Sequence, residues 1–214
     1  MIIAIDGSAA SGKGTLAKRV AAEFGYDYLD TGALYRAVAL SLLNAGVNSN
    51  NIDEKQAVNA ASALDLALTP TAEIRTDKVA ALASIVAAIS PVRSELLALQ
   101  RAFAAAPPSC KGAVLDGRDI GTIVLPYANI KFFIDADLDI RAERRTKELL
   151  QAGQSVIFQN VLADMKARDD RDRTRSVAPL KAADDAITID TSKTDAAAVL
   201  ALALSHIDRI CPSE

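Results

Sequence analysis

The sequence predicts an α/β fold built on a five-stranded, mainly parallel sheet. Short apolar, β-branched runs alternate with longer segments of helical periodicity, which is the pattern of repeated strand–helix–strand units. A glycine-rich segment follows the first apolar run directly and precedes the first helical pattern. The chain has 214 residues, of which 50% are hydrophobic and 24% charged, so it is long enough to bury a substantial core in one domain with an inserted subdomain.

Five strands are expected, each apolar enough to be covered on both faces, as strands of parallel sheets are. In chain order they are Ile2–Ile5, Tyr26–Leu29, Ala113–Leu115, Lys131–Ile134 and Ala186–Ile189. The expected helices are Lys13–Phe24, Ala33–Asn44, Asp53–Ala63, Asp77–Ile89, Pro91–Ala105, Leu138–Ala152, Ser155–Asp169 and Ala196–Ile210. Alanine is frequent in these helices and favours helix formation, so we expect a tight core with few aromatic side chains.

Two stretches interrupt the alternation of strands and helices. Residues 31–106 contain no strong strand pattern, which predicts a helical subdomain inserted beside the sheet. Residues 141–175 are rich in arginine and also lack a strand pattern. Both stretches are candidates for moving parts, and we expect the core of the domain to comprise residues 1–30, 107–140 and 176–214.

Composition excludes several classes of function. The net charge of −3 argues against binding a nucleic-acid polymer or an anionic membrane over the whole surface. The longest apolar run, Val79 to Ile89, is shorter than a membrane span requires, and the N-terminus lacks a secretory signal pattern. We therefore expect a soluble, cytoplasmic protein. Cys110, Cys211 and His206 fit neither a disulfide framework nor a zinc site, and no metal-ligating set is predicted.

The strongest motif is the glycine-rich loop between the first strand and the first helix. It comprises Gly7, Ser8, Ala9, Ala10, Ser11, Gly12, Lys13, Gly14 and Thr15. Its spacing matches G-x-x-x-x-G-K, in which backbone N–H groups and a helix N-terminus bind phosphates while the lysine reaches the β and γ oxygens. Gly14 departs from the general pattern, which has Ser or Thr at this position for Mg²⁺, and Thr15 follows one residue later.

Three further polar clusters follow predicted strands or lie in the arginine-rich stretch. They are Asp30–Arg36, Asp116–Thr122 and Lys166–Arg175. Arginine suits bidentate contact with phosphate, and aspartate accepts hydrogen bonds from amino or hydroxyl groups. The alternative interpretations are structural: Thr31 as a helix cap beside an ordinary surface arginine, a polar turn with a local Asp–Arg pair, and a helix face of ion pairs. The glycine-rich loop in the same chain favours the ligand-binding interpretation.

With these motifs, the chain resembles the bacterial-type cytidylate kinases (CMP kinases), a family of the nucleoside-monophosphate kinase group, along essentially its whole length. The segments that carry the resemblance are Gly7–Thr15, Asp30–Arg36, Glu73–Thr76, Val92–Arg93, Asp116–Thr122 and Arg168–Leu180. The last two are specific to that family, whereas the first is shared by many kinases. The resemblance implies a three-layer P-loop NTPase fold with a helical NMP-binding subdomain at about 31–106 and an arginine-rich lid at about 141–175.

The resemblance also implies roles for individual residues. The residues matching Arg36, Arg118 and Arg175 hold the phosphate of the acceptor, and those matching Ser84, Arg93 and Asp119 read the cytosine edge. Those matching Arg168 and Asp172 contact the sugar, and the one matching Arg144 lies over the donor adenine. Lys13 and the lid arginines, Arg171 among them, are expected to neutralise the transferring phosphoryl group.

The chain departs from the family pattern at two places. Many members carry an inserted β-hairpin before the segment matching Glu73–Thr76, but here Leu64–Ala72 is much shorter, which predicts an acceptor subdomain reduced to its helices. Thr31 stands where a serine is frequent, and it keeps the hydroxyl among the substrate-binding residues.

The expected activity is transfer of the γ-phosphoryl group of ATP, as its Mg²⁺ complex, to CMP or dCMP, in pyrimidine metabolism. The acceptor is already an anion, so in-line positioning and charge neutralisation suffice without a strong general base. Two alternatives stay open: a kinase for another acceptor such as UMP, AMP or shikimate, and a non-catalytic module that binds ATP. The resemblance implies a monomer, and no heptad repeat or apolar stripe in the sequence argues otherwise.

Overall fold

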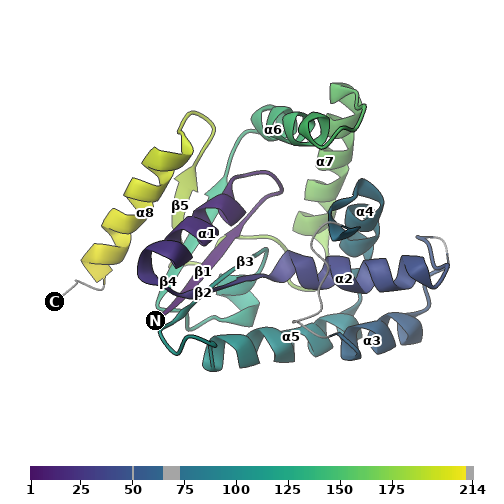
Figure 1. Ribbon diagram of the computed structural model, residues 1–214, viewed down its shortest axis with the longest axis horizontal. Helices are drawn as coiled ribbons and strands as arrows, with labels where there is room; N and C mark the ends of the chain where they lie inside the picture. The colour runs from purple at the N-terminus through teal and green to yellow at the C-terminus, as the bar shows by residue number, and fades with distance from the viewer. Residues whose placement is uncertain (50, 65–72, 211–214) are drawn as a thin grey trace. The chain divides into compact units, whose positions relative to one another are not determined.

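The computed structural model describes residues 1–49, 51–64 and 73–210 (Figure 1). The chain divides into two compact units. The first unit comprises Met1–Leu29 and Pro107–Glu214, and the second is the contiguous segment Asp30–Ala106. The predicted segment of residues 141–175 belongs to the first unit by its contacts.

One parallel sheet organises the first unit. Its strands are β1 (Ile2–Gly7), β2 (Asp27–Asp30), β3 (Ala113–Gly117), β4 (Ile130–Asp135) and β5 (Ile187–Asp190). They lie in the order β2-β3-β1-β4-β5, so β1 is the central strand. Ile2 of β1 pairs with Ala113 of β3, and Ile3 pairs with Ile130 of β4. The predicted α/β fold with a five-stranded parallel sheet is confirmed.

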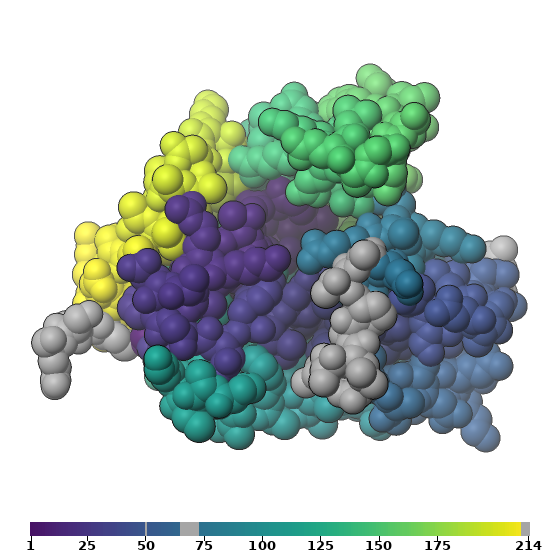
Figure 2. Space-filling model, viewed as in Figure 1, coloured from purple at the N-terminus to yellow at the C-terminus, as the bar shows by residue number. Residues whose placement is uncertain are grey.

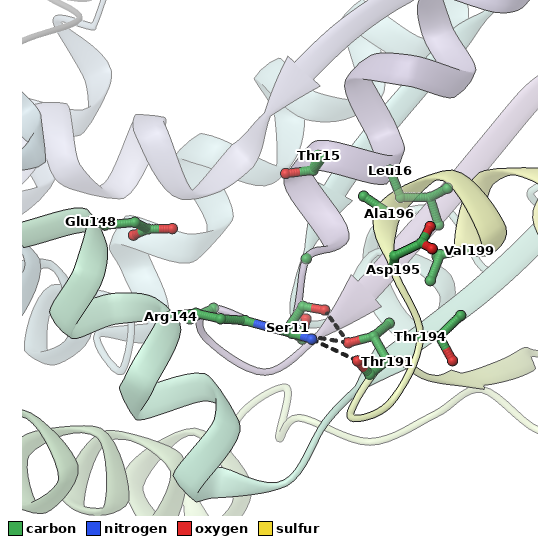
Figure 3. A pocket seen from close by; sticks show the side chains of 12 residues that line it. Ser11, Thr15, Leu16, Arg144, Glu148, Thr191, Thr194, Asp195, Ala196 and Val199 are labelled. Carbon is green, nitrogen blue, oxygen red and sulfur yellow. Dashed lines mark hydrogen bonds between the residues drawn. The ribbon is translucent and has the colours of Figure 1, made fainter. Parts of the chain in front are cut away.

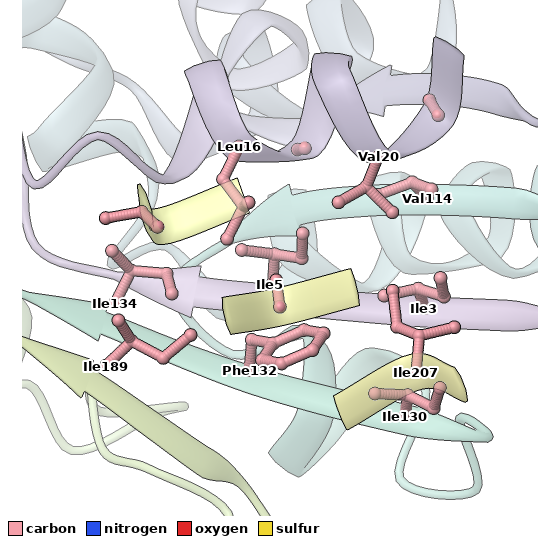
Figure 4. Close-up of a cluster of buried hydrophobic side chains, with 14 residues drawn as sticks. Ile3, Ile5, Leu16, Val20, Val114, Ile130, Phe132, Ile134, Ile189 and Ile207 are labelled. Carbon is pink, nitrogen blue, oxygen red and sulfur yellow. The ribbon is translucent and has the colours of Figure 1, made fainter. Parts of the chain in front are cut away.

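The hydrophobic core of this unit lies between the sheet and two helices, α1 (Lys13–Phe24) and α8 (Ala196–Ile210). Alternate residues of the strands point to this side and meet aliphatic residues of both helices (Figure 4). The largest members are Ile3, Ile5, Leu16, Val20, Val114, Ile130, Phe132, Ile134, Ile189 and Ile207. One phenylalanine among aliphatic and alanine residues gives the aromatic-poor core that the composition predicts.

Two further helices and one short turn complete the described part of the first unit. They are α6 (Leu138–Gln151), α7 (Phe158–Thr174) and a π-helical turn, η3 (Ile120–Val124). α6 and α7 pack on each other through a small cluster that includes Ala142, Leu149, Val161 and Met165. The sequence predicts that the second of these helices ends at Asp169, but α7 continues to Thr174. α7 also begins three residues later than predicted, and in its extension Asp172 pairs with Arg118 and Arg173 lies 3.4 Å from Asp135.

Helices make up most of the second unit. They are α2 (Thr31–Asn44), α3 (Glu54–Ser62), α4 (Asp77–Val86) and α5 (Ser90–Ala105), with a 3₁₀ turn at Glu73–Arg75. α2 begins two residues earlier than predicted because Asp30, not Thr31, caps it: Asp30 Oδ1 accepts a hydrogen bond from the backbone N–H of Ala33 at 3.0 Å. Most of the shortened Leu64–Ala72 segment falls outside the described residues.

Among the described residues, no single helix combines the length and low charge that a bilayer span requires. α4 and α5 reach that length and composition only when taken together, and they bend by 101° at their junction.

Candidate active site

The glycine-rich loop joins the central strand to α1, and its backbone requires glycine at two positions. A Cβ atom at Gly7 would collide with the backbone carbonyl oxygen of Ile134 on β4. Gly12 has a φ of 90° and is the N-cap residue of α1. Because Gly12 has no side chain to cap the helix, the first N–H groups of α1 remain available to an anion.

Side chains from three other elements hold the loop. Ser8 Oγ donates a hydrogen bond to Asp135 Oδ1 at the end of β4, at 2.6 Å. Arg141 Nη1 of α6 donates to the carbonyl oxygen of Ala9 at 3.3 Å, and Thr191 Oγ1, just after β5, donates to that of Ser11 at 2.8 Å. These contacts fix the loop before any ligand binds, which is the preorganisation that electrostatic stabilisation of phosphate requires.

The first turn of α1 carries Lys13 and Thr15. Lys13 is half-buried, and its Nζ donates to the carbonyl oxygen of Ser8 across the loop at 3.4 Å. The Thr15 residue is exposed. The Lys13 ammonium thus lies across the glycine-rich loop, whose backbone N–H groups can bind phosphate. It places positive charge where a phosphate chain would bind.

A cavity of about 360 Å³ adjoins the loop (Figure 3). The loop and α1 form one side, Arg144 and Glu148 of α6 form another, and the turn between β5 and α8 closes the third. Arg144 reaches across to Thr191 and donates to its Oγ1 at 3.0 Å and to its carbonyl oxygen at 2.6 Å. In the space-filling view the purple N-terminal residues are recessed beneath the green residues of α6 and α7 (Figure 2).

A second polar cluster joins the segment after β3 to the end of α7. Arg118 Nε donates to Asp172 Oδ2 at 2.9 Å, and Arg175 Nη2 lies 3.8 Å from Asp119 Oδ1. Burial alone would raise the pKa of Asp172, but the guanidinium groups of Arg118 and Arg168 hold that pKa below its ordinary value. The sequence places the Asp116–Thr122 and Lys166–Arg175 motifs far apart, and the structure brings them together.

Asp6, the residue before the loop, fixes the segment that carries Arg118 and Asp119. Its carboxylate accepts hydrogen bonds from the backbone N–H groups of Ile120 at 2.8 Å and Gly121 at 2.7 Å. Asp6 is 3% exposed, and this burial raises its pKa to about 7 despite the two hydrogen bonds. The central strand is therefore tied to both the phosphate loop and the arginine-bearing segment.

Arg141 and Asp169 connect α6 to α7. Arg141 Nη2 donates to Asp169 Oδ2 at 2.6 Å, and both side chains are less than a tenth exposed. Of the remaining predicted lid arginines on α7, Arg168 is half-buried and Arg171 is exposed. Arg173 lies 3.4 Å from Asp135, the residue that also accepts from Ser8.

The second unit carries the other predicted acceptor residues. Thr31 is buried at the start of α2, and Arg36 on the same helix pairs with Asp30 at 2.7 Å. Ser84 is buried on α4. Arg93 on α5 is 8% exposed, donates to the carbonyl oxygen of Ala87 at 3.2 Å and lies 5.6 Å from the ring centroid of Tyr35.

The list of site residues predicted from the sequence omits two residues that the structure places beside the loop. Asp116 is the next-to-last residue of β3, accepts a hydrogen bond from the Tyr28 hydroxyl at 2.8 Å, and lies close to Gly14. The sequence signal was available, since Asp116 is an acidic residue at the end of a buried strand. Thr191 gave no such signal, because its hydrogen bond to Ser11 spans 180 positions of the chain.

A glycine-rich loop between a central parallel strand and a helix N-terminus, joined to a cavity lined by an arginine, defines the P-loop nucleotide-binding class. The cytidylate kinase family model matches residues 3–209 of this chain. The chain therefore belongs to the cytidylate kinase family.

Individual relatives agree with this assignment. The cytidylate kinase of Paramagnetospirillum magneticum is 54% identical over 207 residues, which cover 96% of this chain and 97% of that protein. The cytidylate kinase of Rhodopseudomonas palustris is 50% identical over 210 residues, covering 98% and 97%. A crystal structure of an uncharacterized protein from Eubacterium ventriosum matches with a TM-score of 0.57 at 18% identity, covering 97% of this chain and 98% of that one, which is a likeness of fold.

Proposed function

We propose that the protein is an ATP-dependent kinase that transfers the γ-phosphoryl group to the phosphate of CMP or dCMP, giving ADP and CDP or dCDP. The observation that carries the proposal is the preformed phosphate loop of the cytidylate kinase family, anchored by Asp135, Arg141 and Thr191. Residues 7–15 would bind the phosphates of ATP, and the cavity beside them would take the adenosine, with Arg144 over the base.

Mg²⁺ fits the residues present beside the loop. A Cβ atom built on Gly14 would lie 3.4 Å from Asp116 Oδ2, so the carboxylate stands against the first turn of α1, where Thr15 offers a hydroxyl. Magnesium is usually held by one or two oxygen ligands of the protein together with substrate phosphates and water. Asp116 and Thr15 would hold the ion, which supplies positive charge to the phosphate oxygens when bound.

The acceptor residues divide by chemistry. Arg36, Arg118 and Arg175 present guanidinium groups suited to the phosphate of CMP. The residues proposed to read the cytosine edge are Ser84, Arg93 and Asp119, and those proposed to contact the sugar are Arg168 and Asp172. Thr31 is proposed as a further substrate-binding residue. A carboxylate at position 119 can accept a hydrogen bond from the exocyclic amino group of cytosine, which uracil lacks.

Catalysis then consists of alignment and charge neutralisation. The acceptor phosphate is already a nucleophile, so Lys13, Arg118, Arg171 and Arg175 need only hold the two phosphates in line and offset the charge of the transferring group. We assign residues about 31–106 as the acceptor-binding subdomain and residues about 141–175 as a lid that excludes water, since an open site would hydrolyse ATP. We also propose that the protein is a cytoplasmic monomer that binds neither membranes nor nucleic-acid polymers.

A coupled assay of ADP release tests the function. Wild-type protein with ATP and Mg²⁺ is offered CMP, dCMP, UMP, AMP and shikimate in parallel, and CMP and dCMP should give by far the highest kcat/KM. A preference for another acceptor would agree with a kinase but contradict the proposal that Ser84, Arg93 and Asp119 read cytosine. ATP binding without turnover of any acceptor would contradict the proposal and favour a non-catalytic module.

A further inference from the structure

Thr191 occupies a junction of the cavity that we assign to ATP. It follows β5, is 3% exposed, and its backbone N–H donates to the carbonyl oxygen of Asp135 at 2.8 Å. Its hydroxyl donates to the carbonyl oxygen of Ser11 in the phosphate loop and accepts from Arg144 Nη1 on α6, as the dashed lines in Figure 3 show. One side chain therefore joins the loop, α6 and the end of the sheet.

The chemistry of a hydroxyl explains why this residue can serve as the link. A hydroxyl can donate one hydrogen bond and accept others at the same time. Ser11 presents a carbonyl oxygen to Thr191, which needs a donor, and Arg144 presents N–H groups, which need an acceptor. A side chain that could only donate, or only accept, would bind one of these two partners and leave the other without its bond. Valine has nearly the shape of threonine and can make neither bond, whereas serine can make both.

The second contact of Arg144 restricts the guanidinium further. Its Nη2 donates to the carbonyl oxygen of Thr191 at 2.6 Å, so the planar group binds both oxygen atoms of one residue. A bidentate contact fixes the orientation of a guanidinium as well as its distance. Removing the hydroxyl leaves one contact and frees the plane to rotate.

We infer that Thr191 is a positioning residue of the ATP site: its hydroxyl sets the orientation of Arg144 against the phosphate loop and so determines the affinity for ATP. This inference rests on the proposed function, because it assigns the adjoining cavity to the donor nucleotide. Thr191 is nearly inaccessible, and its hydroxyl is engaged with the protein, so it acts through Arg144 and Ser11.

Matched variants separate this role from general destabilisation. Thr191→Val removes the hydroxyl with little change in shape, and Thr191→Ser keeps it. Thr188→Val makes the same chemical change three residues earlier, at an exposed position of β5 outside the cavity, and serves as the control. Each variant is assayed for KM of ATP, KM of CMP and kcat, for the affinity of a non-hydrolysable ATP analogue by calorimetry, and for its melting temperature.

Thr191→Val should weaken ATP and analogue binding roughly tenfold, the effect of one to two hydrogen bonds, one of them from a charged donor. The KM of CMP should change less than twofold, while Thr191→Ser and Thr188→Val should stay close to wild type. Unchanged ATP affinity in Thr191→Val, or a Thr191→Ser variant as defective as Thr191→Val, would overturn the inference. A lower melting temperature with unchanged KM for ATP would identify a purely structural role and also contradict it.

A double-mutant cycle with Arg144→Gln tests the route of action. If Thr191 works through Arg144, the Thr191→Val change should cost much less ATP affinity in the Arg144→Gln background than in the wild type. Equal losses in both backgrounds would contradict this route. If Thr191→Val does not fold, Thr191→Ala takes its place in the cycle.

Calorimetry keeps the two proposals distinguishable. Failure of the wild type to phosphorylate CMP would contradict the proposed function, yet analogue binding by the Thr191 variants would still decide the role of the hydroxyl. An active wild type with a normal Thr191→Val variant would contradict only the inference.

Discussion

Lys13 is the residue through which the proposed phosphoryl transfer can be tested most directly. It sits in the first turn of α1 and bends back over the loop toward the carbonyl oxygen of Ser8. Lys13→Ala should lower kcat by about 10²–10³-fold, the usual cost of removing one preorganised electrostatic group. Steady-state kinetics with CMP checks this, with circular dichroism to verify the fold.

Lys18→Ala is the control for Lys13→Ala. Lys18 lies on the exposed side of the same helix, with its Nζ 5.8 Å from the ring centroid of Tyr28. This variant should keep its activity. Near-normal turnover in Lys13→Ala would contradict the proposed role of the phosphate loop in phosphoryl transfer.

Asp119 is the residue through which base choice can be tested. Its side chain is buried in the same unit as the phosphate loop, within 3.8 Å of Arg175. Asp119→Ala should reduce the preference for CMP over UMP about 10- to 100-fold, which is the effect of one buried hydrogen bond to a base. The measurement is the ratio of kcat/KM for the two acceptors. An unchanged ratio would exclude Asp119 from base recognition even if total activity fell.

Asp6 makes the stability of the protein depend on pH. Burial raises its pKa in the folded state to about 7 from an unfolded value of 3.8. The folded state therefore binds the Asp6 proton more tightly than the unfolded state does. The contribution of this difference to the free energy of unfolding is largest below pH 4 and is lost as pH rises toward 7. The nearby charges of Asp119 and Arg118 modify this shift in opposite directions.

The comparison that checks this uses Asp6→Asn, which cannot ionise. Chemical denaturation at several pH values should show the free energy of unfolding of the wild type falling relative to Asp6→Asn between pH 4 and 7, by several kcal/mol in total. A difference between the two proteins that stays constant over this interval would mean that Asp6 ionises as it does in the unfolded chain.

At the scale of elements, the pairing of α6 with α7 depends on a buried arginine. Arg141 makes hydrogen bonds to Asp169 on α7, to the carbonyl oxygen of Ala136 and to that of Ala9 in the loop. Arg141→Leu leaves the Asp169 charge buried without its partner and should lower the free energy of unfolding by about 3–5 kcal/mol. Urea denaturation measures this loss.

Arg145→Leu is the matched control on the same helix. Arg145 is half-buried and pairs at 3.3 Å with the exposed Glu148, and ion pairs open to solvent contribute about 0–1 kcal/mol. The double variant Arg141→Leu with Asp169→Leu should recover part of the stability, since it removes both charges. Equal losses in Arg141→Leu and Arg145→Leu would contradict the structural importance of the buried pair.

Local sequence predicts elements well where local interactions determine them. The helix predicted at Lys13–Phe24 is confirmed at both ends, because glycines with positive φ, Gly12 and Gly25, bound it. The extension of α7 to Thr174 is not apparent from local sequence, since its ion pairs connect Asp172 to Arg118 and Arg173 to Asp135, on other elements. The charge pattern of Lys166–Arg175 is compatible with a helix face of ion pairs but does not indicate where that helix ends.

At the scale of the whole molecule, the parallel sheet and the phosphate loop could be predicted, whereas the supports of the loop could not. The loop has a sequence pattern that requires only neighbouring residues. Its supports, Asp135, Arg141 and Thr191, lie more than 120 positions away and have no pattern of their own. The roles assigned to Arg36, Ser84 and Arg93 stay predictions.

The quaternary state is a property of the entire surface. We expect sedimentation velocity to give the mass of a single chain at all concentrations, because the sequence has no heptad repeat and its net charge of −3 opposes self-association. A mass that rises with protein concentration would contradict this expectation.

The central position of β1 in the sheet has a consequence during synthesis on the ribosome. β1 is made first, yet its two neighbours begin at Ala113 and Ile130, so the first strand cannot pair until more than half of the chain has been translated. The contiguous unit of residues 30–106 is synthesised in the interval between β1 and β3, and it ends only seven residues before Ala113. A nascent chain must therefore keep an apolar strand unpaired while that unit emerges, which is the interval in which chaperones would protect it.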